Sequence, residues 1–217
     1  ALPILRAGLL GRQERGRGAI DDAALALEYQ PANPDRYHLL APLLAIARQQ
    51  PAYEQLCRTI ITRFANTTNV YVADRMAKDC LLLPRAGVDL RLVEKLADVA
   101  VSARNNDEAM PVFQTCKALS EYRLGHFAGA VEWGEKPLKG SQTYAQAHAC
   151  AVLAMADWQL GRKSDARAVL AKGNALAPQP LPASVAEDLG DAWLAWLCAR
   201  ISLDEASALI QAGSDHE

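Results

Sequence analysis

Apolar residues recur at helical spacing along almost the whole chain, and short clusters of Gly, Pro and Asn interrupt them at near-regular intervals. The clearest unit contains Gly125 and Ala130, and both residues recur 36 positions later as Gly161 and Ala166. Amphipathic helices separated by turn residues at a fixed period are typical of stacked helical hairpins. The pattern therefore predicts an all-α protein built from a repeated unit of two helices.

The turn markers set the expected number and bounds of these units. They fall at Gly18, Pro51, Gly87, Gly125 and Gly161. We expect one domain over residues 1–217, with five helix pairs and a final apolar pair that covers the open end of the stack. The helices of this capping pair are expected at Ala186–Ile201 and Leu203–Ala212. The expected pairs span residues 1–34, 35–66, 67–105, 106–140, 141–178 and 184–213.

Composition supports helices and excludes some partners. The chain has 41 Ala and 30 Leu against 11 Val and 7 Ile, which favours helix over strand. The formal net charge of -2 gives no electrostatic reason to expect nucleic acid as a partner. No apolar run reaches the roughly 18 residues that a membrane-spanning helix needs, so we expect no membrane insertion.

The repeated unit resembles the tetratricopeptide repeat (TPR). The resemblance rests on small, turn and apolar residues at the spacings of that family in the unit 153–178: Leu153, Ala154, Gly161, Ala166, Leu170, Gly173 and Pro178. Two family positions differ, because Cys150 replaces an early Trp and Asp157 replaces a Tyr. The resemblance implies a right-handed α-solenoid of stacked antiparallel hairpins, in which the first helix of each hairpin lines a concave groove.

In that family the concave groove binds peptides or helices. The resemblance places these partner-binding residues in the groove: Thr115, Leu119, Tyr122, Arg123, His148, Met155, Trp158 and Gln159. Met155 and Trp158 have an alternative interpretation as core between neighbouring repeats, because aromatic residues at helical spacing are usually packed inside. The Lys and Asn residues that clamp doubly acidic peptides in some relatives are absent from these positions. We therefore expect an apolar or aromatic partner.

Catalytic, cofactor and metal sites are not predicted. None of the four histidines, His38, His126, His148 and His216, lies in a motif that supplies a nucleophile or metal partner. The five cysteines are far apart and form no Cys-x-x-Cys pair, which indicates neither zinc nor redox chemistry. Free cysteines among apolar residues favour a reducing, cytoplasmic location.

These observations predict a scaffold or regulatory module that binds other proteins and is not itself an enzyme. One alternative is a structural spacer or a homodimer that associates through an exposed Trp193 and Trp196. Another is a regulatory tail of an upstream catalytic domain. Strings such as Cys80–Pro84 and Trp193–Arg200 look like repeat tails of large planctomycete-like bacterial proteins that carry a Ser/Thr kinase or propeller domain. The first residue is Ala, so we expect the sequence to be part of a longer chain.

Overall fold

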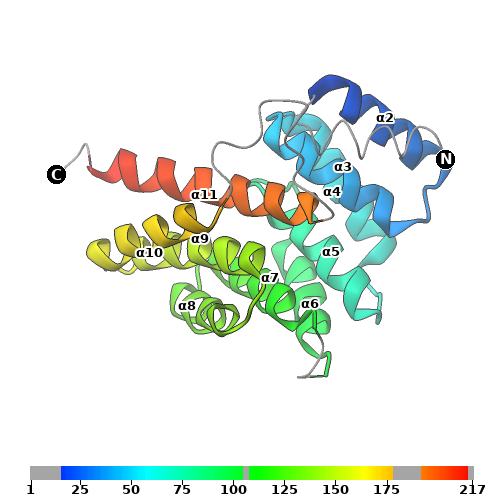
Figure 1. Ribbon diagram of the computed structural model, residues 1–217. Coiled ribbons are helices and arrows are strands. Elements are labelled where there is room, and N and C mark those ends of the chain that lie inside the picture. The colour runs from blue at the N-terminus through cyan, green and yellow to red at the C-terminus, as the bar shows by residue number, and fades with distance from the viewer. Residues whose placement is uncertain (1–15, 105–107, 178–191, 215–217) are drawn as a thin grey trace.

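The computed structural model describes residues 16–104, 108–177 and 192–214, and every regular element in them is a helix (Figure 1). The all-α prediction is therefore confirmed for the described part of the chain. No helix in that part combines the length and apolar character needed to cross a membrane. The elements are α2 (Gly16–Tyr29), α3 (Pro34–Ile46), α4 (Gln50–Phe64), α5 (Val70–Leu81), α6 (Leu90–Val101), α7 (Met110–Arg123), α8 (Phe127–Glu135), the 3₁₀ helix η1 (Pro137–Lys139), α9 (Thr143–Gln159), α10 (Lys163–Leu176) and α11 (Trp193–Ser214).

Short polar side chains begin three of the helices. The side-chain oxygens of Asn33, Asn69 and Asp89 each accept a hydrogen bond from the backbone N–H two residues ahead, at 2.9, 3.0 and 2.9 Å. These bonds satisfy N–H groups that have no partner inside the helix. The start of α3, α5 and α6 is thus encoded locally.

Four of the turns between helices contain a residue with a left-handed backbone conformation. Three predicted turn glycines adopt this conformation: Gly87, Gly125 and Gly161, with φ angles of 68°, 81° and 78°. The other two markers are wrong as turn positions. Gly18 lies inside α2, and Pro51 is the second residue of α4. The left-handed residue before α4 is Arg48, with φ of 54°, so a non-glycine residue fills that place.

The helices pack in two rows (Figure 1). The inner row consists of α3, α5, α7 and α9, each in contact with the next. The outer row consists of α4, α6, α8 and α10, and each of these packs between the inner helix before it and the helix after it. Small residues allow close crossings, since Ala130 and Ala166 are fully buried. The buried Gly173 of α10 also lies directly against Cys150 and Leu203.

The last helix differs from the expected capping pair. Helix α11 runs without a break through residue 202, where the sequence predicted a turn between two helices. No Gly or Pro occurs near this position, and Ser202 and Leu203 are both fully buried inside the fold. The predicted break between a helix that ends at Ile201 and one that begins at Leu203 is therefore wrong. The remainder of the expected capping pair, 184–191, lies outside the described residues, as does the first half of the expected pair 1–34.

Candidate functional site

Helix α11 lies on the inner row, where the sequence predicted a partner. It packs along α9, touches α10, and reaches across to α3 (Figure 1). Toward the end of α3, a cavity of about 220 Å³ is lined on one side by Ala45, Ile46 and Arg48, and on the other by residues of α11 that include Ile201 and Ala208. The inner-row surface under α11 is therefore the candidate functional site, and we call it the α11 site.

The predicted Arg123 makes the strongest contact with α11. Its guanidinium donates to both carboxylate oxygens of Glu205, at 2.5 and 2.6 Å. It also donates to the backbone carbonyl of Leu81 at 2.9 Å, just where α5 ends. The Arg123 side chain is only 5% exposed, and paired, bidentate geometry is what makes such a buried charge tolerable. One side chain thus joins α5, α7 and α11.

The predicted His148 makes a second polar contact, with Ser202 of α11. The Ser202 Oγ and His148 Nε2 lie 2.9 Å apart, and both residues are buried. Burial, followed by the charges of Lys78 and Arg123, lowers the pKa of His148 to about 3. The imidazole is therefore neutral at physiological pH. Although the spacing suits a nucleophile and its base, a buried imidazole with this pKa is too weak a base to activate a serine.

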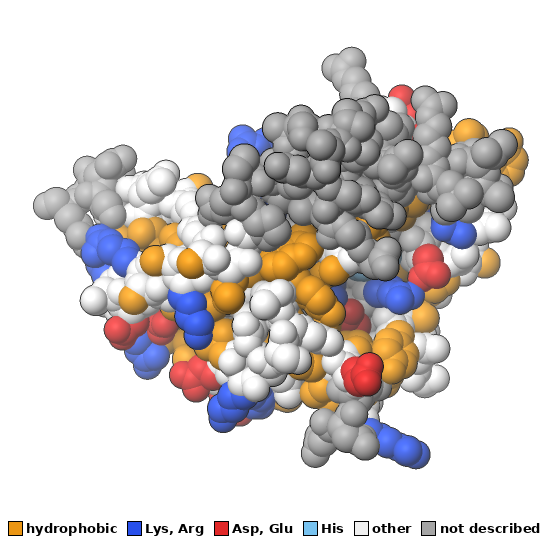
Figure 2. All heavy atoms as spheres, in the orientation of Figure 1, with side chains coloured by type: hydrophobic (Ala, Val, Ile, Leu, Met, Phe, Trp, Pro, Cys, Tyr) orange, Lys and Arg blue, Asp and Glu red, His pale blue; other side chains and the backbone are white. Residues whose placement is uncertain are grey.

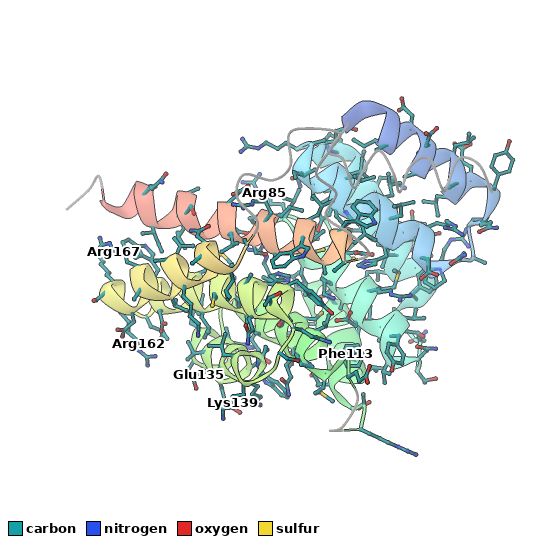
Figure 3. The ribbon with its side chains drawn as sticks, in the orientation of Figure 1. Arg85, Phe113, Glu135, Lys139, Arg162 and Arg167 are labelled. Carbon is teal, nitrogen blue, oxygen red and sulfur yellow. The ribbon has the colours of Figure 1, made fainter. Side chains whose placement is uncertain are left out.

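Trp158 and Gln159 lie toward the C-terminal end of α11. Trp158 is half-buried, and a Cβ added at Gly213 would come within 2.4 Å of its Cζ2 atom, so α11 passes directly against the ring. The cationic groups of Lys163 and Arg167 lie 5.1 and 5.3 Å from the ring centroid. Arg167 is labelled at this end of α10 in Figure 3. Gln159 is exposed.

The other predicted residues are packed inside the inner row. Thr115, Leu119 and Met155 are at most 1% exposed, and Thr115 donates its hydroxyl to the carbonyl of Pro111 at 2.8 Å. Tyr122 is half-buried, with its ring 5.7 Å from that of Phe127. Burial raises its pKa, and the nearby Glu205 carboxylate adds to the effect. Whether these side chains bind a separate partner stays a prediction.

Two polar pairs that involve α5 were not predicted. Lys78 donates to Asp74 at 2.7 Å, and His38 Nδ1 lies 2.8 Å from Asp79. Burial opposes the charge on Lys78, but the charge and hydrogen bond of Asp74, together with the nearby Cys116 and Cys198, outweigh burial and raise the pKa of Lys78 above its ordinary value. Lys78 is therefore protonated and cannot act as a nucleophile. Its spacing from Asp74 is that of a surface pair on a helix, so the burial of this pair could not be predicted.

One cluster of ligand-type side chains lies away from α11. Glu94, Glu121 and His126 bring their ligand atoms within 4.8 Å of one another. However, the Lys117 ammonium lies 2.7 Å from Glu121, 2.8 Å from Asp98 and 3.4 Å from Glu94. This lysine already supplies the positive charge that a metal would bring, so the cluster is best explained as an ion-pair network.

The tryptophans of α11 do not form an exposed patch. Trp193 is 7% exposed, and Trp196 is half-buried with its ring 6.2 Å from Tyr144 in an edge-to-face arrangement. The exposed surface that would mark self-association at this end is therefore not present on these two residues.

Apolar side chains gather in the middle of the face drawn in Figure 2. This is the region in which α7, α9 and α11 lie in Figure 1.

Comparison with protein-family models, with curated proteins and with solved structures finds no match to this chain.

Proposed function

We propose that this chain is a protein-interaction scaffold, a right-handed solenoid of TPR-like hairpins whose inner row binds an amphipathic helix. The observation that carries the proposal is the position of α11. A helix lies on the inner row, and it is bound through Arg123 and His148, two residues that the sequence assigned to a partner. The chain's own helix thus acts as the first occupant of its binding surface.

The chemistry of α11 indicates what the surface recognises. Its inward residues are apolar or small, as in Leu197, Leu203, Ala206 and Ile210, all buried. Helices laid into grooves are recognised through such apolar anchors at helical spacing. The carboxylate of Glu205 adds a charged contact that fixes the register. A partner of this surface is therefore an amphipathic helix with one acidic residue placed to meet Arg123.

A labelled peptide with the sequence of residues 193–214 tests this proposal. The full chain carrying Glu205→Ala has a weakened α11 contact, because Arg123 is left buried without its carboxylate. We expect this chain to bind the peptide at least about tenfold more tightly than the unmodified chain does, measured by fluorescence anisotropy. The peptide supplies the missing carboxylate, so a peptide carrying the same Glu205→Ala change should bind the variant chain more weakly.

The matched control is Gln211→Ala, a change at an exposed position of the same helix. It should leave peptide binding as weak as in the unmodified chain. If the Glu205→Ala chain stays folded by circular dichroism yet binds neither peptide, or binds both equally, α11 is a fixed part of the core and the proposal fails.

A further inference from the structure

A separate cavity of about 330 Å³ lies beside the N-terminal end of α11. Five helices contribute to its lining: α3, α5, α7, α9 and α11. None of the eight residues that the sequence assigned to partner binding belongs to it. The side chains that matter for its chemistry are His38, Tyr71, Asp74, Arg75, Lys78 and Phe113.

The two cations of the lining have hydrogen-bond donors to spare. The Lys78 side chain is 7% exposed, and its ammonium gives one of its three hydrogens to Asp74 at 2.7 Å. The Arg75 guanidinium uses its Nη1 atom on Asp35, a residue outside the lining, at 2.5 Å. The Nε and Nη2 atoms of Arg75 have no hydrogen-bond partner among the described residues.

The acceptors next to these donors are already used or out of reach. Asp74 Oδ2 accepts from Lys78, and Asp74 Oδ1 is completely buried, so a molecule in the cavity cannot contact it. The remaining ionisable ring of the lining, His38, is paired through its Nδ1 atom with Asp79 at 2.8 Å. A molecule that pairs with Lys78 and Arg75 must therefore bring acceptors of its own.

Aromatic and aliphatic side chains form the walls. Tyr71 and Phe113 meet edge to face, with ring centroids 5.5 Å apart. Phe113 is labelled in Figure 3. Tyr144, Val112 and Leu194 complete the apolar part of the lining. Such a cavity, apolar with a few convergent polar groups, is the usual form of a small-molecule site.

We propose that this cavity binds a small aromatic carboxylate. The carboxylate accepts hydrogen bonds from Lys78 and Arg75, and the aromatic ring packs against Tyr71 and Phe113. Hydrogen bonds between charged partners are roughly twice as strong as those between neutral ones. A carboxylate therefore binds here more tightly than the neutral amide of the same shape.

The balance of charge favours a carboxylate over a phosphate. Lys78 and Arg75 each already face one carboxylate, that of Asp74 and that of Asp35. The cavity thus offers spare donors but little excess positive charge. A second negative charge on the ligand would be repelled by these two carboxylates without a further cation to balance it. A singly charged head group is the better match.

Benzoate, benzamide and phenyl phosphate test the proposal with the full chain, because they share one ring and differ in the head group. Titration of the isotope-labelled protein followed by NMR should give benzoate a Kd of about 1 mM, as expected for so small a ligand. Benzamide and phenyl phosphate should each bind at least about fivefold more weakly. The amide signals that move with benzoate should include those of Tyr71–Lys78 and Ala109–Phe113, which border the cavity.

Arg75→Gln removes one of the two cationic donors, and it should weaken benzoate binding about fivefold. The pair of Arg75 with Asp35 is at the surface, so its loss should leave the protein folded. Arg91→Gln is the matched control, because it makes the same change of charge at an exposed position of α6, a helix that contributes nothing to the lining. It should leave benzoate binding unchanged.

Benzamide or phenyl phosphate binding as tightly as benzoate would overturn the choice of a carboxylate. An absence of benzoate binding would show that the cavity holds only solvent, and would also overturn the proposal. Benzoate binding that is unaffected by Arg75→Gln, or that moves only signals of other helices, would place the ligand elsewhere on the molecule. Since none of these outcomes depends on a helix binding at the α11 site, the proposal stands or falls independently of the scaffold function.

Discussion

Gly173 lies in the second half of α10, and its replacement by Ala should destabilise the protein although Ala favours helices. A Cβ at this position would lie 2.8 Å from the Cβ of Cys150 on α9 and 2.9 Å from the Cδ2 of Leu203 on α11. It would also lie 3.4 Å from the backbone oxygen of Ala147. Leu203 has rotatable bonds with which to move away, but the Cβ of Cys150 is fixed to the backbone of α9.

Two opposing effects set the magnitude. Replacing Gly by Ala inside a helix stabilises by about 1 kcal/mol. Forcing an extra carbon into a packed interior costs typically about 1–3 kcal/mol, and here the contact with Cys150 can be relieved only by moving α9 and α10 apart. We therefore expect Gly173→Ala to lower the free energy of unfolding by up to about 2 kcal/mol.

Urea denaturation followed by circular dichroism measures this change, and Gly129→Ala is the matched control. A Cβ at Gly129 would meet only the side chain of Glu121, at 3.1 Å, which can give way by a few tenths of an ångström while keeping its ion pair with Lys117. The control should therefore raise the free energy of unfolding by up to about 1 kcal/mol. Amide hydrogen exchange in α11 should also become faster in Gly173→Ala, because Leu203 is displaced. If Gly173→Ala gains stability as the control does, the close approach of α9, α10 and α11 at this point is refuted.

Three further predictions concern buried polar groups. Because the pKa of His148 is lowered to about 3, the unfolded chain binds a proton below pH 6.5 that the folded chain does not. The free energy of unfolding should thus decrease as the pH is lowered, and His148 should contribute about 2 kcal/mol of the loss between pH 7 and pH 5. In His148→Gln, urea denaturation should show a loss that is smaller by this amount. Lys78→Met should cost about 3–5 kcal/mol by leaving Asp74 buried without its partner, and adding Asp74→Leu should recover much of it; thermal unfolding that shows no recovery would contradict the pairing. Tyr53→Phe should cost about 1–2 kcal/mol in urea denaturation, because the buried hydroxyl bonds to a backbone carbonyl of α5 at 2.7 Å and to the amide of Leu83; an unchanged midpoint would argue against both bonds.

The hairpins could be predicted because their signals are local. A glycine such as Gly125 or Gly161 imposes a left-handed turn through its own backbone, and the alanine five residues later fits the close helix crossing. The left-handed turn at Arg48 could not be predicted in this way, since a residue with a Cβ rarely adopts this conformation. The marker at Pro51 was close to the turn, but proline favours the first turn of a helix, and Pro51 therefore lies inside α4.

The path of α11 could not be predicted from the sequence. Its apolar residues surround much of the helix, and such a pattern indicates burial without naming the surface that buries it. Similarly, Arg123 and His148 could be placed on the inner side of their helices by repeat spacing, but their partners Glu205 and Ser202 lie 82 and 54 residues away. Only the folded chain shows that these groups meet.

The contact between α3 and α11 changes how the chain behaves as a folding unit. In an open repeat array each hairpin touches only its neighbours, so stability accumulates from one end to the other and a shortened array remains folded. Here, α3 near the start of the described chain contacts α11 at its end, and Arg48 and Ile201 line one cavity. The loop that must close spans about 150 residues, which slows folding and favours a single cooperative transition. During synthesis, the inner row stays uncovered until α11 has been made, and the partner helix proposed above would meet the least competition from α11 in that interval.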